Sequence, residues 1–114
     1  MKQILLDTNF ILTCIRQKID FFEDIYLMGM HIIIPKEVIK ELEKLKKESA
    51  LKLLRKEKGK FKRIFLSGKN VDNSIIRYAK ENPSVIIATL DKGLKTKIKN
   101  KKMIIRGRKK LEII

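Results

Sequence analysis

Ile4-Leu5-Leu6-Asp7-Thr8-Asn9, near the start of the chain, is the stretch that decides the fold. Its three consecutive aliphatic residues predict a strand buried on both faces, as in a parallel sheet, and this strand ends at an aspartate. Ligands of open parallel sheets bind just beyond the carboxyl ends of the strands, so Asp7 lies where a site is built. The alternative interpretation is that Asp7 only caps a helix beginning near Thr8.

A second buried strand repeats this arrangement later in the chain. Residues Ser84 to Leu90 read SVIIATL, and Asp91 follows directly. Carboxyl ends of parallel strands lie at the same edge of a sheet. If the two strands are neighbours, Asp7 and Asp91 therefore come within about 5 Å of each other.

Two further acids lie on predicted helices. Glu41 falls on or beside the apolar stripe of a helix from Lys36 to about Glu48, where a lysine partner or an edge position would also explain it. Asp72 falls on the buried stripe, in the first turn of a helix that begins at Val71. An N-cap or helix-dipole role is the alternative for Asp72.

The alternation of strands and helices predicts a three-layer α/β/α fold with right-handed crossovers, in one domain spanning residues 1–114. We expect a central, mainly parallel sheet of four to five strands. The helical pattern of residues 50–66 is interrupted only near Gly59, and the chain ends in a strand, a basic turn and a short apolar segment. The four strands that follow directly from the pattern are residues 4–6, 31–34, 84–90 and 102–105.

Charge and residue usage narrow the class of protein. The 114 residues have a net charge of +15, and residues 55–114 carry nineteen of the 28 Lys and Arg, which favours a nucleic-acid partner. With one histidine, His31, and one cysteine, Cys14, thiolate or imidazole metal sites and catalytic triads are excluded. No apolar run approaches the roughly 20 residues of a membrane span and no signal-peptide pattern is present, so we expect a soluble, cytoplasmic protein.

Four carboxylates at one sheet edge predict a metal site. At short range each unscreened pair of like charges costs on the order of a few kcal/mol, which a bound cation offsets. Ligand sets made only of oxygen select a hard ion such as Mg²⁺ or Mn²⁺.

Four segments of the chain together resemble a known family. The segments that carry the resemblance are Asp7-Thr8-Asn9 after a short strand, Pro35-x-x-Val38-x-x-Glu41-Leu42, Val71-Asp72-x-x-Ile75 and Thr89-Leu90-Asp91-x-x-Leu94. In this order, and across essentially the whole chain, they are similar to the PIN domain, a metal-dependent nuclease fold.

The resemblance implies a set of roles. Asp7, Asp72 and Asp91 match the metal-binding aspartates of the family, and Glu41 matches its helix-borne glutamate. Thr8 and Thr89 resemble the hydroxyl residues that orient the neighbouring acids. Some members carry a further acid just after the last position, where this chain has Lys92 and Gly93.

The function implied is that of a Mg²⁺- or Mn²⁺-dependent endoribonuclease, in which metal-activated water attacks an RNA phosphodiester. Cations near the acids must then hold the RNA, and the best placed are Lys92, Lys95, Arg106 and Arg108. The sequence resembles the ribosomal-RNA-processing branch more than the VapC-type toxins, while a toxin and a catalytically inactive RNA-binding scaffold stay open as alternatives. Partners left open besides RNA are a second copy of the chain, a ribosome-assembly factor and an antitoxin.

Overall fold

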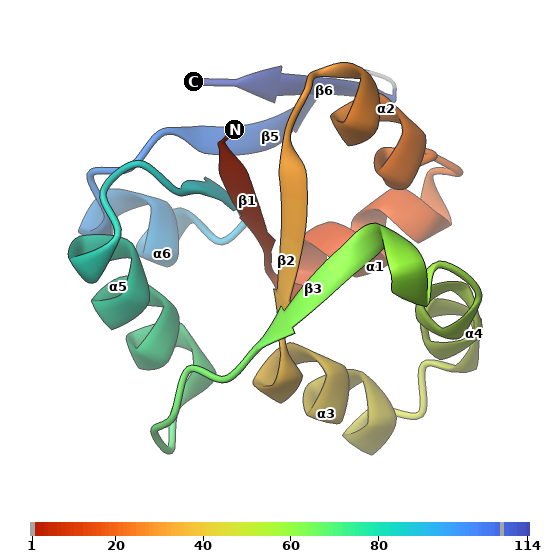
Figure 1. Cartoon of the computed structure of the whole chain (residues 1–114), viewed down its shortest axis with the longest axis horizontal. Helices are drawn as coiled ribbons and strands as arrows, with labels where there is room; N and C mark the ends of the chain where they lie inside the picture. Colours follow the sequence, from red (N-terminus) through yellow and green to blue (C-terminus); the bar gives the residue numbers. More distant parts are fainter. Residues whose placement is uncertain (1, 108) are drawn as a thin grey trace.

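The centre of the molecule is a sheet in which β1 (Gln3–Leu6) lies between β2 (His31–Pro35) and β4 (Ile86–Ala88), parallel to both. In the computed structural model, which describes residues 2–107 and 109–114, this sheet has six strands in the order β3-β2-β1-β4-β5-β6 (Figure 1). Only the last pairing, between β5 (Lys102–Arg106) and β6 (Lys110–Ile113), is antiparallel. The predicted mainly parallel α/β fold is therefore confirmed.

Helices cover both faces of the sheet, because successive strand residues point to opposite sides. Ile4 and Leu6 pack into one core, whereas Leu5 between them packs into the other. The first core is completed by α1 (Thr8–Arg16), α2 (Phe21–Leu27), α3 (Lys36–Lys44) and α4 (Glu48–Lys56), and the second by α5 (Val71–Glu81) and α6 (Lys92–Lys97). Each fully buried aliphatic side chain stabilises the fold by roughly 1.5–3 kcal/mol, so β1 is held from both sides.

The sheet has six strands rather than the four to five predicted, and β3 (Phe61–Ile64) is the strand that the prediction missed. Phe61 and Ile64 are three residues apart, a spacing that fits a helix face as well as a short strand. As an edge strand, β3 leaves Lys62 and Arg63 exposed, so its sequence lacks a continuous apolar run. A short helix, η1 (Lys58–Lys60), precedes it.

The predicted single helix from Lys36 to about Glu48 is also wrong, since α3 ends at Lys44 and α4 begins at Glu48. Lys46 has a φ of 56°, in the left-handed region, which ends the first helix and turns the chain. Among residues 2–107 and 109–114, no helix has the length and apolar character needed to cross a bilayer.

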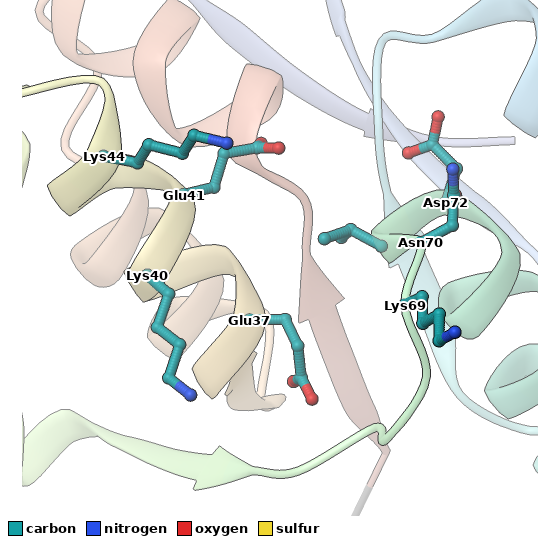
Figure 2. Close-up of a pocket in the computed structure, with 8 residues that line it drawn as sticks. Glu37, Lys40, Glu41, Lys44, Lys69, Asn70 and Asp72 are labelled. Carbon is teal, nitrogen blue, oxygen red and sulfur yellow. The ribbon is translucent and has the colours of Figure 1, made fainter.

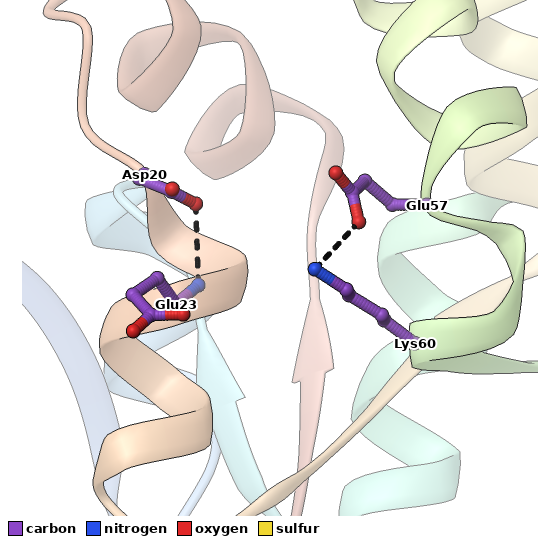
Figure 3. A network of polar contacts seen from close by, with 4 residues as sticks. All are labelled: Asp20, Glu23, Glu57 and Lys60. Carbon is purple, nitrogen blue, oxygen red and sulfur yellow. Dashed lines mark hydrogen bonds and ion pairs between the residues drawn. The ribbon is translucent and has the colours of Figure 1, made fainter.

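The start of α2 and the segment before β3 carry a local polar network (Figure 3). The Asp20 carboxylate accepts a hydrogen bond from the backbone N–H of Glu23 at 3.2 Å and caps α2. Lys60 forms an ion pair with Glu57 at 3.0 Å, and this contact, with Asp20 and Glu23 nearby, raises the pKa of Lys60. The positive charge of Lys60 is thus balanced by acidic residues that lie close to it on the surface.

Candidate functional site

Asp7 and Asp91 meet at the carboxyl edge of the sheet, because β1 and β4 are parallel neighbours. Leu6 pairs with Ala88, and the backbone N–H of Asp7 donates to the carbonyl of Ala88 at 3.0 Å. Asp91 lies three residues beyond Ala88 and begins α6. The two strands are therefore parallel neighbours whose carboxyl ends lie at one edge of the sheet.

The Asp7 carboxylate is buried, with 5% of the residue exposed. One oxygen accepts the backbone N–H of Thr8 at 2.8 Å, and the other accepts the hydroxyl of Thr89 at 2.9 Å. Burial raises the pKa of Asp7 most; the bonds from Thr89 and Thr8 oppose that rise, and the charges of Asp72 and Glu41 add to it. Asp7 caps α1, but the burial and repulsion at its carboxylate exceed what capping alone requires.

A single buried hydroxyl connects the two aspartates. Thr89 donates its hydroxyl hydrogen to Asp7 and accepts the backbone N–H of Asp91 at 3.2 Å. Asp91 in turn accepts the N–H of Leu94 at 3.1 Å and caps α6. The Thr8 hydroxyl differs, since within the described chain it is buried without a hydrogen-bond partner, and it is the backbone of Thr8 that contacts Asp7.

Asp72 joins the same group of charges from α5. Burial and then the charges of Asp91 and Glu41 raise the pKa of Asp72, while Lys97 lowers it. The prediction that Asp72 lies on a buried stripe is wrong, because the residue is exposed at the edge of the site. The N-cap alternative is also wrong, since the cap of α5 is Asn70, which accepts the N–H of Asn73 at 3.0 Å.

Glu41 is half-buried on α3, beside the apolar stripe as predicted. It faces Asp72 across a cleft of about 440 Å³ between α3 and the start of α5 (Figure 2). Because the pKa values of Asp7 and Asp72 both respond to the charge of Glu41, the three carboxylates share one electrostatic environment. The lining residues of the cleft are Glu37, Lys40, Glu41, Lys44, Lys69, Asn70, Val71 and Asp72.

The loop that leads into α5 is held from both sides, which the sequence did not reveal. The carboxylate of Glu37 on α3 accepts the backbone N–H groups of Leu66 and Ser67 at 3.1–3.2 Å. The guanidinium of Arg77 on α5 donates to the carbonyls of the same two residues. Glu37 lies one turn from Glu41, so this loop couples the position of Glu41 to that of the Asp72 helix.

The four acids have the donor chemistry of a hard divalent ion but stand apart from one another. In residues 2–107 and 109–114, no three His, Cys, Asp or Glu residues form a group that could hold an ion. The ion pairs within 4.0 Å in that part of the chain are Lys60–Glu57 and Arg106–Glu112, and neither includes one of the four acids. Four like charges without an ion pair of this kind repel one another, and Glu41 on α3 and Asp72 on α5 lie on opposite sides of the cleft.

The cations predicted to hold RNA are placed unevenly. Lys92 is exposed and Lys95 half-buried on α6, which starts at Asp91. Arg106 ends β5 at the same sheet edge, but it forms an ion pair with Glu112 at 2.7 Å. Arg108 lies outside the described residues.

The parallel sheet and its acidic edge define the class of protein. Residues 4–110 match the family model described as "PIN like domain", and the chain belongs to the PIN domain family. The resemblance stated from the sequence is thereby confirmed.

Several known proteins are similar to this chain. Ribonuclease VapC4 of Methanocaldococcus jannaschii is 34% identical over 128 residues, with 99% of this chain and 97% of that protein covered. The rRNA-processing proteins fcf1 of Schizosaccharomyces pombe and FCF1 of Saccharomyces cerevisiae are 34% and 35% identical. The alignments cover 84% and 85% of this chain but only 53% and 54% of the two yeast proteins, so the chain spans about half their length.

A solved structure supports the same assignment. The structure of the PIN domain endonuclease Utp24 superposes with a TM-score of 0.82 at 30% identity, covering 97% of this chain and 90% of that one. VapC4 is named as a ribonuclease and Utp24 as a PIN domain endonuclease, and both support an RNA-cleaving function for this chain. They include both a VapC protein and rRNA-processing proteins at similar identity, so the preference for the processing branch stays a prediction.

Proposed function

We propose that the protein is a Mg²⁺- or Mn²⁺-dependent endoribonuclease whose catalytic centre is formed by Asp7, Glu41, Asp72 and Asp91. The observation that carries this proposal is the electrostatic coupling of the acids at the carboxyl edge of the sheet. The pKa of Asp7 is raised by Asp72 and Glu41, and that of Asp72 by Asp91 and Glu41. Such repulsion lowers stability and is typical of sites that bind cations or perform catalysis.

Each acid has a proposed task set by its place in the fold. Asp7 is the buried and rigid ligand, since Thr8 and Thr89 hold its two oxygens while each oxygen keeps a free lone pair. Glu41 on α3 and Asp72 on α5, which line the two sides of the cleft, would be further ligands of the ion. Asp91 keeps one carboxylate oxygen for the ion, because the other caps α6.

A divalent ion bound there supplies a nucleophilic water at neutral pH and offsets the charge that develops on the phosphate. The chain itself positions the RNA and shields the carboxylates from substrate repulsion with nearby cations. Lys92, Lys95, Arg106 and Arg108 are proposed for that contact. Arg106 must break its ion pair with Glu112 before it can bind a phosphate. Lys92 is exposed and next to Asp91, so it can bind a phosphate without breaking an ion pair.

The proposal is tested first by metal binding, which does not depend on activity. We expect Mn²⁺ to raise the melting temperature of the wild-type protein, since a ligand that binds only the folded state stabilises it. Asp7→Asn should weaken that response while the metal-free variant is as stable as the wild type or more so. Asp91→Asn should behave alike, because asparagine remains a good helix cap. Strong destabilisation of both metal-free variants would show that capping is the role of these acids.

Cleavage of a labelled RNA then separates an enzyme from a scaffold. We expect Mg²⁺- or Mn²⁺-dependent cleavage that EDTA abolishes and that Asp7→Asn protein, purified in parallel, lacks. Equal cleavage by the variant would identify a contaminating nuclease. A metal response without cleavage of any RNA would favour the inactive RNA-binding scaffold.

A different experiment distinguishes a ribosomal-RNA-processing enzyme from a toxin. Processing of ribosomal RNA is proposed from the similarity to the two fcf1 proteins, which are named as rRNA-processing proteins. The similarity to Ribonuclease VapC4 over nearly its full length favours the toxin alternative. Growth arrest on expression without an antitoxin would identify a toxin, whereas accumulation of ribosomal RNA precursors on depletion would identify a processing enzyme.

A further inference from the structure

The cleft between α3 and α5 adjoins a second cleft, which lies against another face of α3. The first, about 440 Å³, is lined by three acids, Glu37, Glu41 and Asp72, and by three lysines, Lys40, Lys44 and Lys69. The second, about 330 Å³, lies over α3, α4 and β3 and is lined by Lys36, Ile39, Lys40, Glu43, Leu51, Leu54, Arg55 and Arg63. Lys40 lines both clefts, so together they form a path that leads from the acids across α3 to the edge strand β3.

Six cations line this path, and we name them the α3 track: Lys36, Lys40, Lys44, Arg55, Arg63 and Lys69. They come from α3, α4, β3 and the loop before α5, and all six are exposed. Within residues 2–107 and 109–114, the close ion pairs involve none of them. Lys60 is the contrast, since it is matched by Glu57 (Figure 3).

Unmatched cations in a concave surface concentrate positive potential and attract polyanions. The single acid of the second cleft, Glu43, leaves that cleft with a positive balance against four cations. Clefts of about 300–1,000 Å³ accommodate ligands the size of a drug molecule, which is also the size of a mononucleotide. The shape therefore suits one strand of nucleic acid, whose backbone can follow a bent path, better than a rigid duplex.

We infer that the α3 track binds the backbone phosphates of single-stranded RNA on one side of the cleavage site. This inference rests on the proposed function, because it takes the acid cluster as the point of cleavage. The track runs toward β2 and β3, on one side of β1 and Asp7, whereas Lys92 and Lys95 on α6 follow β4, on the other side of β1. An RNA strand held on both sides would cross the acids between its two contacts, which places a phosphodiester at the metal ligands.

The test is RNA binding in EDTA, where no cleavage takes place. Arg55→Gln with Arg63→Gln removes two track cations that are remote from the acid cluster. For a single strand, the slope of log K against log salt falls by about 0.7 for each phosphate that the protein no longer neutralises, so the double variant should lose about 1.4. The matched control is Lys80→Gln with Lys101→Gln, which removes the same charge from exposed positions at the end of α5 and before β5.

We expect the control to retain the wild-type slope and the track variant to bind a labelled single-stranded 20-mer more weakly. An equal loss in both double variants would overturn the inference, since binding would then follow net charge alone. An unchanged slope in the track variant would overturn it as well and would leave the clefts to a protein partner. Lys36→Gln with Arg63→Gln is the second track variant, and melting curves of all variants verify folding.

The outcome is separable from that of the proposed function. Cleavage by the wild type and its loss in Asp7→Asn test the acids, whereas the salt slope in EDTA tests the track without metal or chemistry. Cleavage with an unchanged slope would retain the nuclease and reject the track. A reduced slope without cleavage would retain the track and reject the nuclease.

Discussion

Removing the Thr89 hydroxyl tests the contact that joins the two strand-end aspartates. Thr89 is fully buried, and its hydroxyl donates to Asp7 while accepting the N–H of Asp91. Thr89→Val replaces this hydroxyl with a methyl group of the same shape, so no cavity is created. The variant isolates the two hydrogen bonds from the packing of the side chain.

The magnitude follows from the partners of the hydroxyl. A hydrogen bond to a charged group contributes about 1.5–3 kcal/mol, and the Asp91 N–H loses an acceptor in a partly buried position. We expect Thr89→Val to lower the free energy of unfolding by about 2–3 kcal/mol at neutral pH. At about 4 °C per kcal/mol for a chain of this size, the melting temperature falls by roughly 8–12 °C.

The loss in free energy of unfolding caused by Thr89→Val should be larger at neutral pH than at acidic pH. Because the Thr89 hydroxyl opposes the rise in the pKa of Asp7, its removal moves that pKa further above the ordinary value of 3.8. A folded-state pKa above the unfolded value lowers stability as pH rises through it, so the penalty is largest at neutral pH and shrinks when Asp7 is protonated.

Urea denaturation followed by circular dichroism at pH 3 and pH 7 measures both effects. Thr89→Ser is the control, since it keeps the hydroxyl and loses one methyl group, at a cost of about 1 kcal/mol. A penalty for Thr89→Val no larger than that of Thr89→Ser, or equal at both pH values, would refute the idea that the hydroxyl stabilises the charged form of Asp7.

Three further predictions concern buried or bridging groups. Asp7→Asn should flatten the loss of stability that the metal-free wild type shows as pH rises through the raised pKa of Asp7, so that urea denaturation finds the variant at least as stable as the wild type at neutral pH. Glu37→Gln should lower the free energy of unfolding by about 1–2 kcal/mol, because a neutral amide holds the two loop N–H groups less well. Burial raises the pKa of Cys14 to about 12, so a thiol reagent at pH 8 should detect no thiol until denaturant is added.

Each of these has an outcome that contradicts it. A parallel pH dependence for wild type and Asp7→Asn would mean that Asp7 is not the group that titrates. Glu43→Gln, an exposed change on the same helix, should be neutral, and an equal loss there would remove the special role of Glu37. Rapid labelling of Cys14 in the native protein would show that α1 opens readily.

The positions of the proposed catalytic acids show how much of the site can be predicted from local sequence pattern. Asp7 and Asp91 follow the strands β1 and β4, whose continuous aliphatic residues can be satisfied only by burial on both faces. Parallel pairing of β1 with β4 then places both acids beyond the strand ends at one sheet edge, so this placement was predictable without coordinates. The same reasoning placed Glu41 beside the apolar stripe of α3.

Predictions failed where a neighbour distant in sequence decides the conformation. β3 is a strand because it pairs with β2, although its own residues fit a helix equally well. Asp72 is exposed in the first turn of α5, although the spacing of Ile75 and Ala79 placed it on the buried stripe. Neither fact is contained in the spacing of apolar residues.

The sequence by itself determined the central strands, the family and the acids at the strand ends, because each depends on short-range pattern and on the geometry common to all parallel sheets. Only the tertiary structure decided how the rest of the site is assembled. The bond from Glu37 to a loop 29 residues later, and the meeting of two cation-lined clefts at Lys40, arise from side chains of separate elements. Such contacts form only after the helices have packed on the sheet, since packing fixes which side chains share a surface.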